Sequence, residues 1–182
     1  MQTHIINWPE DAARLPELHS GDVVRLSGTI YTARDAAHRR IIELLDQGGE
    51  LPLELQDAAI YYAGPCPCPP GMVVGSIGPT TASRMDIYKE RMMQAGQKLM
   101  IGKGICMPEL AGLCQQYGAV YLSAPGGVAA LSSACVTSCE LIAWEELGAE
   151  ALRKLTVKDM GLVVINDVYG RDYYREVLAE QA

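Results

Sequence analysis

The sequence predicts an α/β fold in which a mixed sheet is flanked by helices. Short apolar runs of strand length alternate along the chain with segments that have the apolar spacing of helices, which is the pattern of α/β proteins. Several connections are too short for the crossover that joins parallel strands, so antiparallel pairs are expected as well. No internal repeat or low-complexity linker divides the chain. We therefore expect residues 1–182 to form a single domain.

The first third of the chain contains two predicted strands and one predicted helix. Residues 22–33 alternate as in one strand, or as in a hairpin with Gly28 at the bend. Residues 35–45 have helical spacing and are followed by a Gly-Gly pair that ends a helix. The apolar run 58–63 suits a buried strand. It leads into residues 64–71, where four of the ten prolines exclude both a helix and a central strand.

The remaining predicted elements continue this alternation. The predicted strands are short apolar runs at 72–75, 99–101, 120–122, 140–144 and 162–165. The predicted helices lie at 85–97, 108–117 and 128–135. Turn-rich loops separate these elements, at 78–84, 102–104 and 125–127.

The composition argues against several kinds of partner. The chain carries 15 Lys and Arg against 22 Asp and Glu, a net charge of −7. Nucleic acid and anionic membranes require a basic surface, so neither is an expected partner. The N-terminus lacks a basic segment followed by an apolar one, and no apolar run reaches the roughly 18 residues of a membrane span. We expect a cytoplasmic location, where the six cysteines would be reduced.

Cations and hydroxyls gather in the loops that follow predicted strands. At such strand ends, free backbone N–H groups and helix N-termini favour anions. The candidate side chains for binding a small dianion are Arg34, Thr80, Thr81, Arg84 and Lys103. Arginine matches a carboxylate with two parallel hydrogen bonds, and lysine adds a compact charge. For any one of these cations alone, a solvated surface position is the more common alternative.

Two further side chains, those of His38 and Asp167, have two open interpretations each. His38 lies four residues beyond Arg34, so the two would share a helix face. It could orient Asp35 or a substrate carboxylate, or it could serve packing or capping. Asp167 follows an apolar run, where it would be a site carboxylate or part of an ordinary turn.

The sequence contains no motif for nucleotide binding or for metal binding. The chain has neither a P-loop nor a Gly-x-Gly-x-x-Gly run, which argues against nucleotide binding. The cysteine spacing matches neither zinc ribbons nor ferredoxin-type clusters, so no metal ligand set is predicted. We interpret Cys106, Cys114, Cys135 and Cys139 as small apolar fillers. Cys66 and Cys68 alternate with prolines, and a weak metal or redox role stays open for them.

Five segments, in order along the chain, carry a family resemblance. They are SGTIYTARDAAH at 27–38, YYAGP at 61–65, GSIGPTTASRMD at 75–86, IGKG at 101–104, and GAVYL at 118–122 with the Gly-Gly pair at 126–127. With these segments the sequence resembles the class I fumarase and L(+)-tartrate dehydratase family. The similarity is to the β subunit, which is equivalent to the C-terminal domain of the single-chain enzymes.

The resemblance implies a swivelling β/β/α domain and an α subunit as partner. That subunit would hold an oxygen-sensitive four-iron four-sulfur cluster through three cysteines. The implied reaction is the reversible hydration of a C4 dicarboxylate, with fumarate and (S)-malate preferred and tartrate dehydration to oxaloacetate as the alternative. Both substrates need the same cations, so the choice between them stays open. A homodimer of the isolated chain is also expected.

The resemblance also implies roles for individual residues. Arg34, Arg84 and Lys103 match the carboxylate binders of the family. Thr80 matches the hydroxyl proposed to move the proton at the carbon beside a carboxylate. Ser83 stands where family members often have glycine, so its hydroxyl could alter which substituents the site tolerates. A more distant alternative is a non-catalytic module that binds a dicarboxylate, or a metal through the two proline-flanked cysteines.

Overall fold

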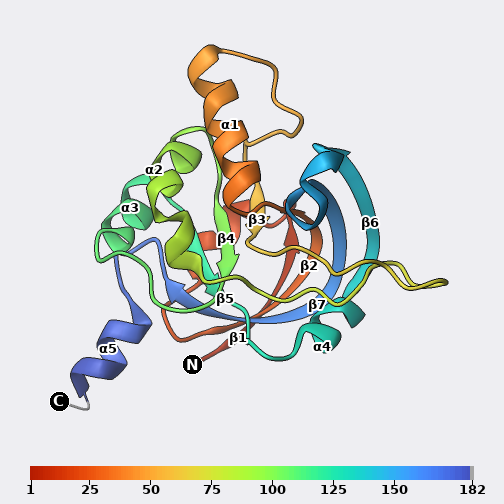
Figure 1. The fold of residues 1–182 in the computed structure, drawn as a ribbon. Coiled ribbons are helices and arrows are strands. Elements are labelled where there is room, and N and C mark those ends of the chain that lie inside the picture. The colour runs from red at the N-terminus through yellow and green to blue at the C-terminus, as the bar shows by residue number, and fades with distance from the viewer. Residues whose placement is uncertain (181–182) are drawn as a thin grey trace.

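The computed structural model describes residues 1–180 and shows an α/β fold with a mixed sheet (Figure 1). The strands are β1 (Thr3–Trp8), β2 (Val23–Thr32), β3 (Ala59–Tyr61), β4 (Leu99–Gly102), β5 (Val120–Ser123), β6 (Val136–Ala143) and β7 (Leu152–Asn166). Each of β1 to β5 is parallel to its neighbour in the order β1-β2-β3-β4-β5. Strand β7 is antiparallel to β2, β5 and β6. The predicted mixed sheet is therefore confirmed.

The long strand β7 closes the sheet into a ring. It pairs with β2 along one edge and with β5 and β6 along the other. Strands β2, β3, β4, β5 and β7 are thereby joined in a closed circuit. The predicted strands at 140–144 and 162–165 are parts of the longer β6 and β7.

Gly28 lies inside one continuous strand, so of the two alternatives for residues 22–33 the single strand is correct. The register of β2 against β7 shifts between Leu26 and Gly28, as at a β-bulge. Gly28 has a φ of 108°, and a Cβ there would lie 2.1 Å from the carbonyl oxygen of Trp8. Only glycine allows β1 to approach β2 this closely.

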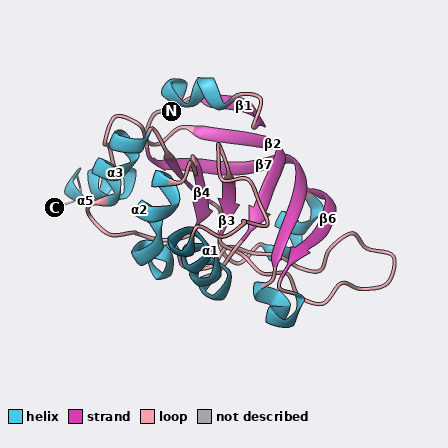
Figure 2. Ribbon diagram, turned by 90° about the horizontal axis from the view of Figure 1, so that it is seen from above, coloured by secondary structure: helices cyan, strands magenta, loops and turns pink. Residues whose placement is uncertain are grey.

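Helices α1 (Asp35–Gln47), α2 (Asp86–Gln94) and α3 (Leu110–Tyr117) gather on one side of the sheet (Figure 2). The other helical elements are α4 (Ala129–Ala134), α5 (Tyr173–Glu180), and the 3-10 turns η1 (Ala12–Glu17), η2 (Ala82–Met85) and η3 (Glu145–Glu150). Helix α2 ends before Gly96, whose φ is 114°, which is why the helix is shorter than the predicted 85–97.

Two apolar cores lie on opposite faces of the strands. Alternate residues of β3 and β4 explain this division, because successive side chains of a strand point to opposite faces. Tyr61 and Ile101 belong to the core of the strand ring, whereas Ile60 and Met100 belong to the core beneath the helices. Burial on both faces accounts for the uninterrupted apolar runs in the sequence.

Three segments differ from the sequence prediction. Residues 72–75 contain bends rather than a strand, and Met72 and Val73 are exposed there. Strand β1 and helix α5 were not predicted. Helix α5 has no buried residue, and only its two tyrosines, Tyr173 and Tyr174, pack against the core.

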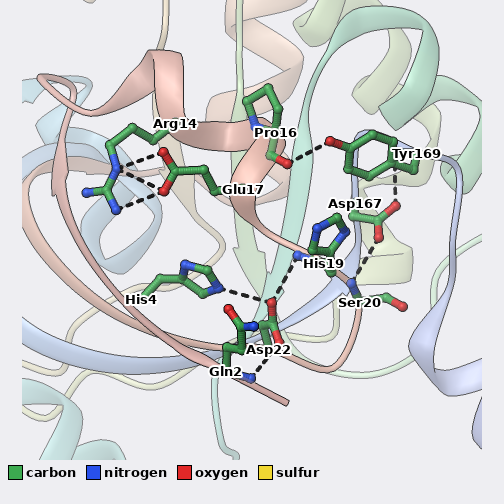
Figure 3. Close-up of polar contacts among 10 residues, drawn as sticks. All are labelled: Gln2, His4, Arg14, Pro16, Glu17, His19, Ser20, Asp22, Asp167 and Tyr169. Carbon is green, nitrogen blue, oxygen red and sulfur yellow. Dashed lines mark hydrogen bonds and ion pairs between the residues drawn. The ribbon is translucent and has the colours of Figure 1, made fainter.

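Asp22 joins β1 to the start of β2 (Figure 3). Its carboxylate accepts hydrogen bonds from the backbone N–H groups of Gln2 at 2.7 Å and His19 at 3.2 Å, and it lies 3.0 Å from Nε2 of His4. Burial alone would raise the pKa of Asp22, but these hydrogen bonds outweigh burial and hold the pKa below its usual range. His4 thus contacts Asp22 through its side chain, whereas His19 contributes its backbone N–H and stacks its ring on Tyr169 at a centroid distance of 5.1 Å.

Asp167 organises the turn after β7 (Figure 3). Its fully buried carboxylate accepts hydrogen bonds from the backbone N–H groups of Ser20 at 2.9 Å, Tyr169 at 3.0 Å and Arg171 at 3.1 Å. Of the two interpretations of Asp167, the structure therefore confirms the turn, because both carboxylate oxygens accept hydrogen bonds from backbone N–H groups.

Candidate functional site

The candidate loops meet where the parallel strands end. Arg34 follows β2 and precedes α1, and Lys103 follows β4 directly. The loop that carries Thr80 is attached between β3 and β4. The Thr80 N–H donates to the carbonyl oxygen of Tyr62 at 2.6 Å, and the Lys103 N–H donates to that of Thr80 at 3.2 Å. Because the carboxyl ends of parallel strands lie at one edge of a sheet, these loops form one surface.

Gly102 allows the Thr80 loop to lie directly on the end of β4. A Cβ at Gly102 would come within 2.8 Å of the Tyr62 ring and 2.9 Å of the Ala82 side chain. The Ala82 N–H donates to the carbonyl oxygen of Lys103 at 2.8 Å, and Thr81 forms a parallel bridge with Lys103. The glycine before Lys103 is therefore required for the two loops to touch.

Arg84 connects the same loop to the start of α1. Its Nη2 lies 2.9 Å from Oδ2 of Asp35, and its Nε donates to Oδ1 at 3.2 Å. The side chains of Arg84 and Asp35 are 49% and 28% exposed, so the pair is open to solvent and to a competing anion. Thr81 and Ser83 are also exposed, whereas Thr80 is half-buried.

Arg34 has a carboxylate partner that the sequence did not predict. Its Nη2 lies 3.2 Å from Oε1 of Glu150, and Oε2 of Glu150 accepts a hydrogen bond from the Ala36 N–H at 2.9 Å. Glu150 therefore holds the guanidinium and caps the first turn of α1 with a single carboxylate. No local pattern reveals this role, because Glu150 stands more than a hundred positions after α1 begins.

Lys103 is flanked by the loop after β5. A Cβ on Gly126 would lie 3.4 Å from Cδ and 3.7 Å from Nζ of Lys103, so the Gly126 backbone passes beside this side chain. The structure thus places all five predicted anion-binding residues on neighbouring loops.

His38 lies beneath this surface. It is fully buried, its Nδ1 is 2.9 Å from the carbonyl oxygen of Arg34, and its ring stacks on Tyr88 at a centroid distance of 5.6 Å. The Tyr62 ring meets it edge-on at 5.4 Å. Burial lowers the pKa of His38 to about 4, so the ring is neutral at pH 7. This position agrees with the packing interpretation rather than with direct substrate contact.

The cysteines are free and dispersed. Cys106 and Cys114 are buried, and burial raises the pKa of both thiols. Cys66 and Cys68 are exposed and line a groove of about 500 Å³ together with Cys139. Among residues 1–180, no three His, Cys, Asp or Glu side chains are placed to hold a metal ion. The donor groups of the described chain therefore do not fit an iron–sulfur cluster.

The chemistry available at this surface is anion binding beside a hydroxyl. The loops that carry Arg34, Arg84 and Lys103 lie at the same sheet edge as Thr80, and the guanidinium groups of Arg34 and Arg84 are held by carboxylates. Such a set can bind two carboxylate groups and stabilise negative charge that develops on one of them. No helix in the part of the chain that the structure describes is long and apolar enough to cross a membrane.

A family model and similar known proteins agree on the family to which this chain is similar. The family model described as Fumarase C-terminus matches residues 3–177. The L(+)-tartrate dehydratase subunit beta of Escherichia coli K12 is 37% identical over 177 residues, which cover 94% of this chain and 87% of that protein. A Methanocaldococcus jannaschii protein that bears the same subunit name provisionally is 42% identical over 167 residues, or 88% of this chain and 86% of its own length.

Single-chain enzymes match over a smaller part of their length. The anaerobic class I fumarate hydratase of Escherichia coli K12 is 37% identical over 174 residues, which cover 94% of this chain but 32% of the relative. The chain thus spans about one third of the fumarate hydratases that it matches. The family model, in contrast, covers nearly every residue that the structure describes. The chain belongs to the Fumarase C-terminus family.

Proposed function

We propose that this chain is the β subunit of a hydro-lyase that reversibly hydrates a C4 dicarboxylate, with fumarate and (S)-malate as the preferred pair. The observation that carries the proposal is that the loops bearing Arg34, Thr80, Arg84 and Lys103 adjoin one another at one sheet edge. Relatives named as fumarate hydratases and as tartrate dehydratase β subunits support the reaction class.

In this proposal the three cations bind the two carboxylates of the substrate. Arg34 and Arg84 each present a planar fork, which Glu150 and Asp35 hold in place until an anion competes for it. Lys103 adds a charge beside Thr80, because the backbone of the two residues is hydrogen-bonded. Thr80 moves the proton at the carbon next to a carboxylate. A threonine hydroxyl is a weak base, and neighbouring cations favour its ionised form.

An α subunit is the proposed partner. Loss of the hydroxyl group of a 2-hydroxy acid is assisted by a Lewis acid, which the resemblance assigns to a four-iron four-sulfur cluster. Because the donor groups of residues 1–180 do not fit such a cluster, we propose that the α subunit holds it. The exposure of Arg84 and Thr81 supports a surface that a partner completes.

The remaining expectations belong to the same proposal. Residues 1–182 would act as one domain of the swivelling β/β/α type, which the closed ring of strands with helices on one side supports. Six free cysteines support a reducing, cytoplasmic location. We also propose that the isolated chain is a homodimer and binds neither nucleic acid nor membranes, as its net charge of −7 suggests.

Tartrate dehydration is the second candidate. The specific observation in its favour is that two relatives named as L(+)-tartrate dehydratase β subunits are 37% and 42% identical to this chain. The two substrates differ in one hydroxyl group, and the cations described here would bind either. Side by side assays with both substrates decide between them.

The test is anaerobic reconstitution of the chain with its α subunit and cluster, followed by assays with fumarate, (S)-malate and L(+)-tartrate. We expect turnover of one pair, and an intact complex that turns over none of them would overturn the proposal. Thr80→Val and Arg84→Ala should each remove most of kcat/KM without preventing assembly, and Arg91→Met on the exposed face of α2 is the matched control. Undiminished activity of Thr80→Val would reject its proton-transfer role.

The non-catalytic alternative has a separate test. A module that binds metal through Cys66 and Cys68 should be purified with stoichiometric metal that Cys66→Ala removes. A folded chain without metal would dispose of this alternative.

A further inference from the structure

A buried ion pair lies directly behind the two central loops of the candidate site. Lys89, on α2, is only 1% exposed. Its Nζ donates hydrogen bonds to the carboxylate of Asp86, to the carbonyl oxygen of Ala82 at 3.1 Å and to the thiol of Cys106 at 2.9 Å. In sequence this lysine looks like an ordinary cation on a solvated helix face. Because Lys89 is buried, its ammonium group interacts with groups inside the protein rather than with water.

The surroundings of Lys89 make its carboxylate partner necessary. The Nζ atom lies 5.8 Å from the ring centre of Tyr62 and 5.6 Å from that of Tyr121. Aromatic faces attract a cation, but they do not replace the water that it has lost. Asp86, whose side chain is 16% exposed, supplies the opposite charge. Removal of either charge alone would leave the other one unpaired beneath the site.

The second oxygen of Asp86 reaches a different loop. Oδ2 accepts a hydrogen bond from the Met107 N–H at 3.0 Å. Tyr121 holds the same segment, because its hydroxyl donates to the carbonyl oxygen of Gly104 at 2.9 Å. The chain immediately after Lys103 is therefore attached at two points to the layer behind it.

The other loop is attached to the same pair. Ala82 lies between Thr81 and Arg84; its carbonyl oxygen accepts from Lys89, and its N–H donates to Lys103. One ion pair thus contacts the turn that carries Arg84 and, through Asp86, the segment that follows Lys103. Moving this pair would change how far apart the two loops stand.

We infer that Asp86 is a positioning residue, with Lys89 as its counter-ion, which fixes the Thr80–Arg84 loop against the Lys103 loop. The inference rests on the proposed function, in which side chains of both loops act on one substrate molecule. Catalysis of this kind depends on placement, and a misplacement of about 1 Å can cost a factor of about 100 in rate. Neither Asp86 nor Lys89 needs to touch the substrate.

Two double variants separate positioning from stability. Asp86→Ala with Lys89→Met removes both charges, so no buried charge is left unpaired, and it also removes the acceptor for the Met107 N–H. Asp86→Asn with Lys89→Met removes the same charges but keeps an amide oxygen at that place. The two proteins therefore differ chiefly in whether residue 86 can hold the loop that follows Lys103.

The measurements are kcat and KM of each variant in the reconstituted complex, with thermal unfolding and amide hydrogen exchange of residues 79–84 and 103–107. We expect the Ala/Met variant to lose about 10-fold to 100-fold in kcat, with a smaller change in KM and faster exchange of residues 103–107. Both double variants should exchange faster than the wild type at residues 79–84, because both lose the hydrogen bond from Lys89 to Ala82. The Asn/Met variant keeps an acceptor for the Met107 N–H, so it should lose less kcat than the Ala/Met variant and exchange more slowly at residues 103–107. A lowered unfolding temperature with unchanged kcat would overturn the inference, because it would show a structural role only.

Failure of the proposed function gives a different result. If the wild-type complex turns over no dicarboxylate, the enzyme assignment falls, and the exchange measurement still tests whether residue 86 holds the loop that follows Lys103. If the wild type is active and the two double variants have equal kcat and equal exchange, the positioning role falls while the enzyme assignment stands.

Discussion

Replacement of Glu150 tests how much one carboxylate contributes to both Arg34 and α1. In Glu150→Ala the Ala36 N–H loses its acceptor, which costs about 1 kcal/mol for a helix cap. The ion pair with Arg34, whose side chains are 22% and 25% exposed, adds about 0.5 kcal/mol. The free energy of unfolding should therefore fall by about 1.5 kcal/mol. For a chain of this size that is a decrease of about 3 to 6 °C in Tm.

Glu150→Gln is the matched variant, because its amide oxygen can still accept from Ala36 while its charge is gone. We expect it to lose about 0.5 kcal/mol, or roughly a third of the effect of alanine. Urea unfolding at equal slopes measures both differences. Equal losses for the two variants would refute the capping argument. A loss below about 0.3 kcal/mol for alanine would refute both contributions.

Three other predictions use contacts described above. The pKa of His38 is lowered in the fold to about 4, so its contribution to stability is present above its ordinary pKa of 6.5 and is lost as pH falls from there toward 4; His38→Phe should flatten that part of a stability profile measured by urea unfolding. Gly28→Ala should cost at least about 3 kcal/mol in the same assay, because its Cβ would meet the backbone of Trp8 at a positive φ, whereas Gly161→Ala, with open space around it, should change little. Asp35→Ala should cost under about 1 kcal/mol, because its pair with Arg84 is open to solvent, and a larger loss on urea unfolding would contradict that.

The strands that are buried along nearly their whole length could be predicted from the sequence. The runs that became β3, β4 and β5 are apolar throughout because the strands are covered on both faces. Only residues 162–165 of β7 could be predicted, because the rest of this 15-residue strand includes charged and exposed positions and Gly161, which interrupt the apolar pattern. The strand predicted at 72–75 is wrong because this apolar run has no neighbouring strand to pair with, and apolar residues alone do not form a strand.

The same limit applies to the candidate site. Loops that follow strands in sequence order could be placed together, because parallel strands end at one edge of the sheet. The partners of those loops could not be foreseen. Glu150 contacts Arg34 across more than a hundred positions, and the role of Lys89 depends on burial that its polar sequence surroundings do not indicate. Pairing at such separations is a property of the packed fold alone.

The ring closure by β7 sets the order in which this chain can be completed during synthesis. One edge of β2 pairs with residues 153–163, so this edge has no partner until those residues have left the ribosome. Contacts of such large sequence separation slow folding. An unpaired edge is meanwhile open to other chains. Truncation before residue 152 should therefore yield aggregates rather than a smaller folded unit, and a chaperone that shields β2 would raise the yield of the full chain.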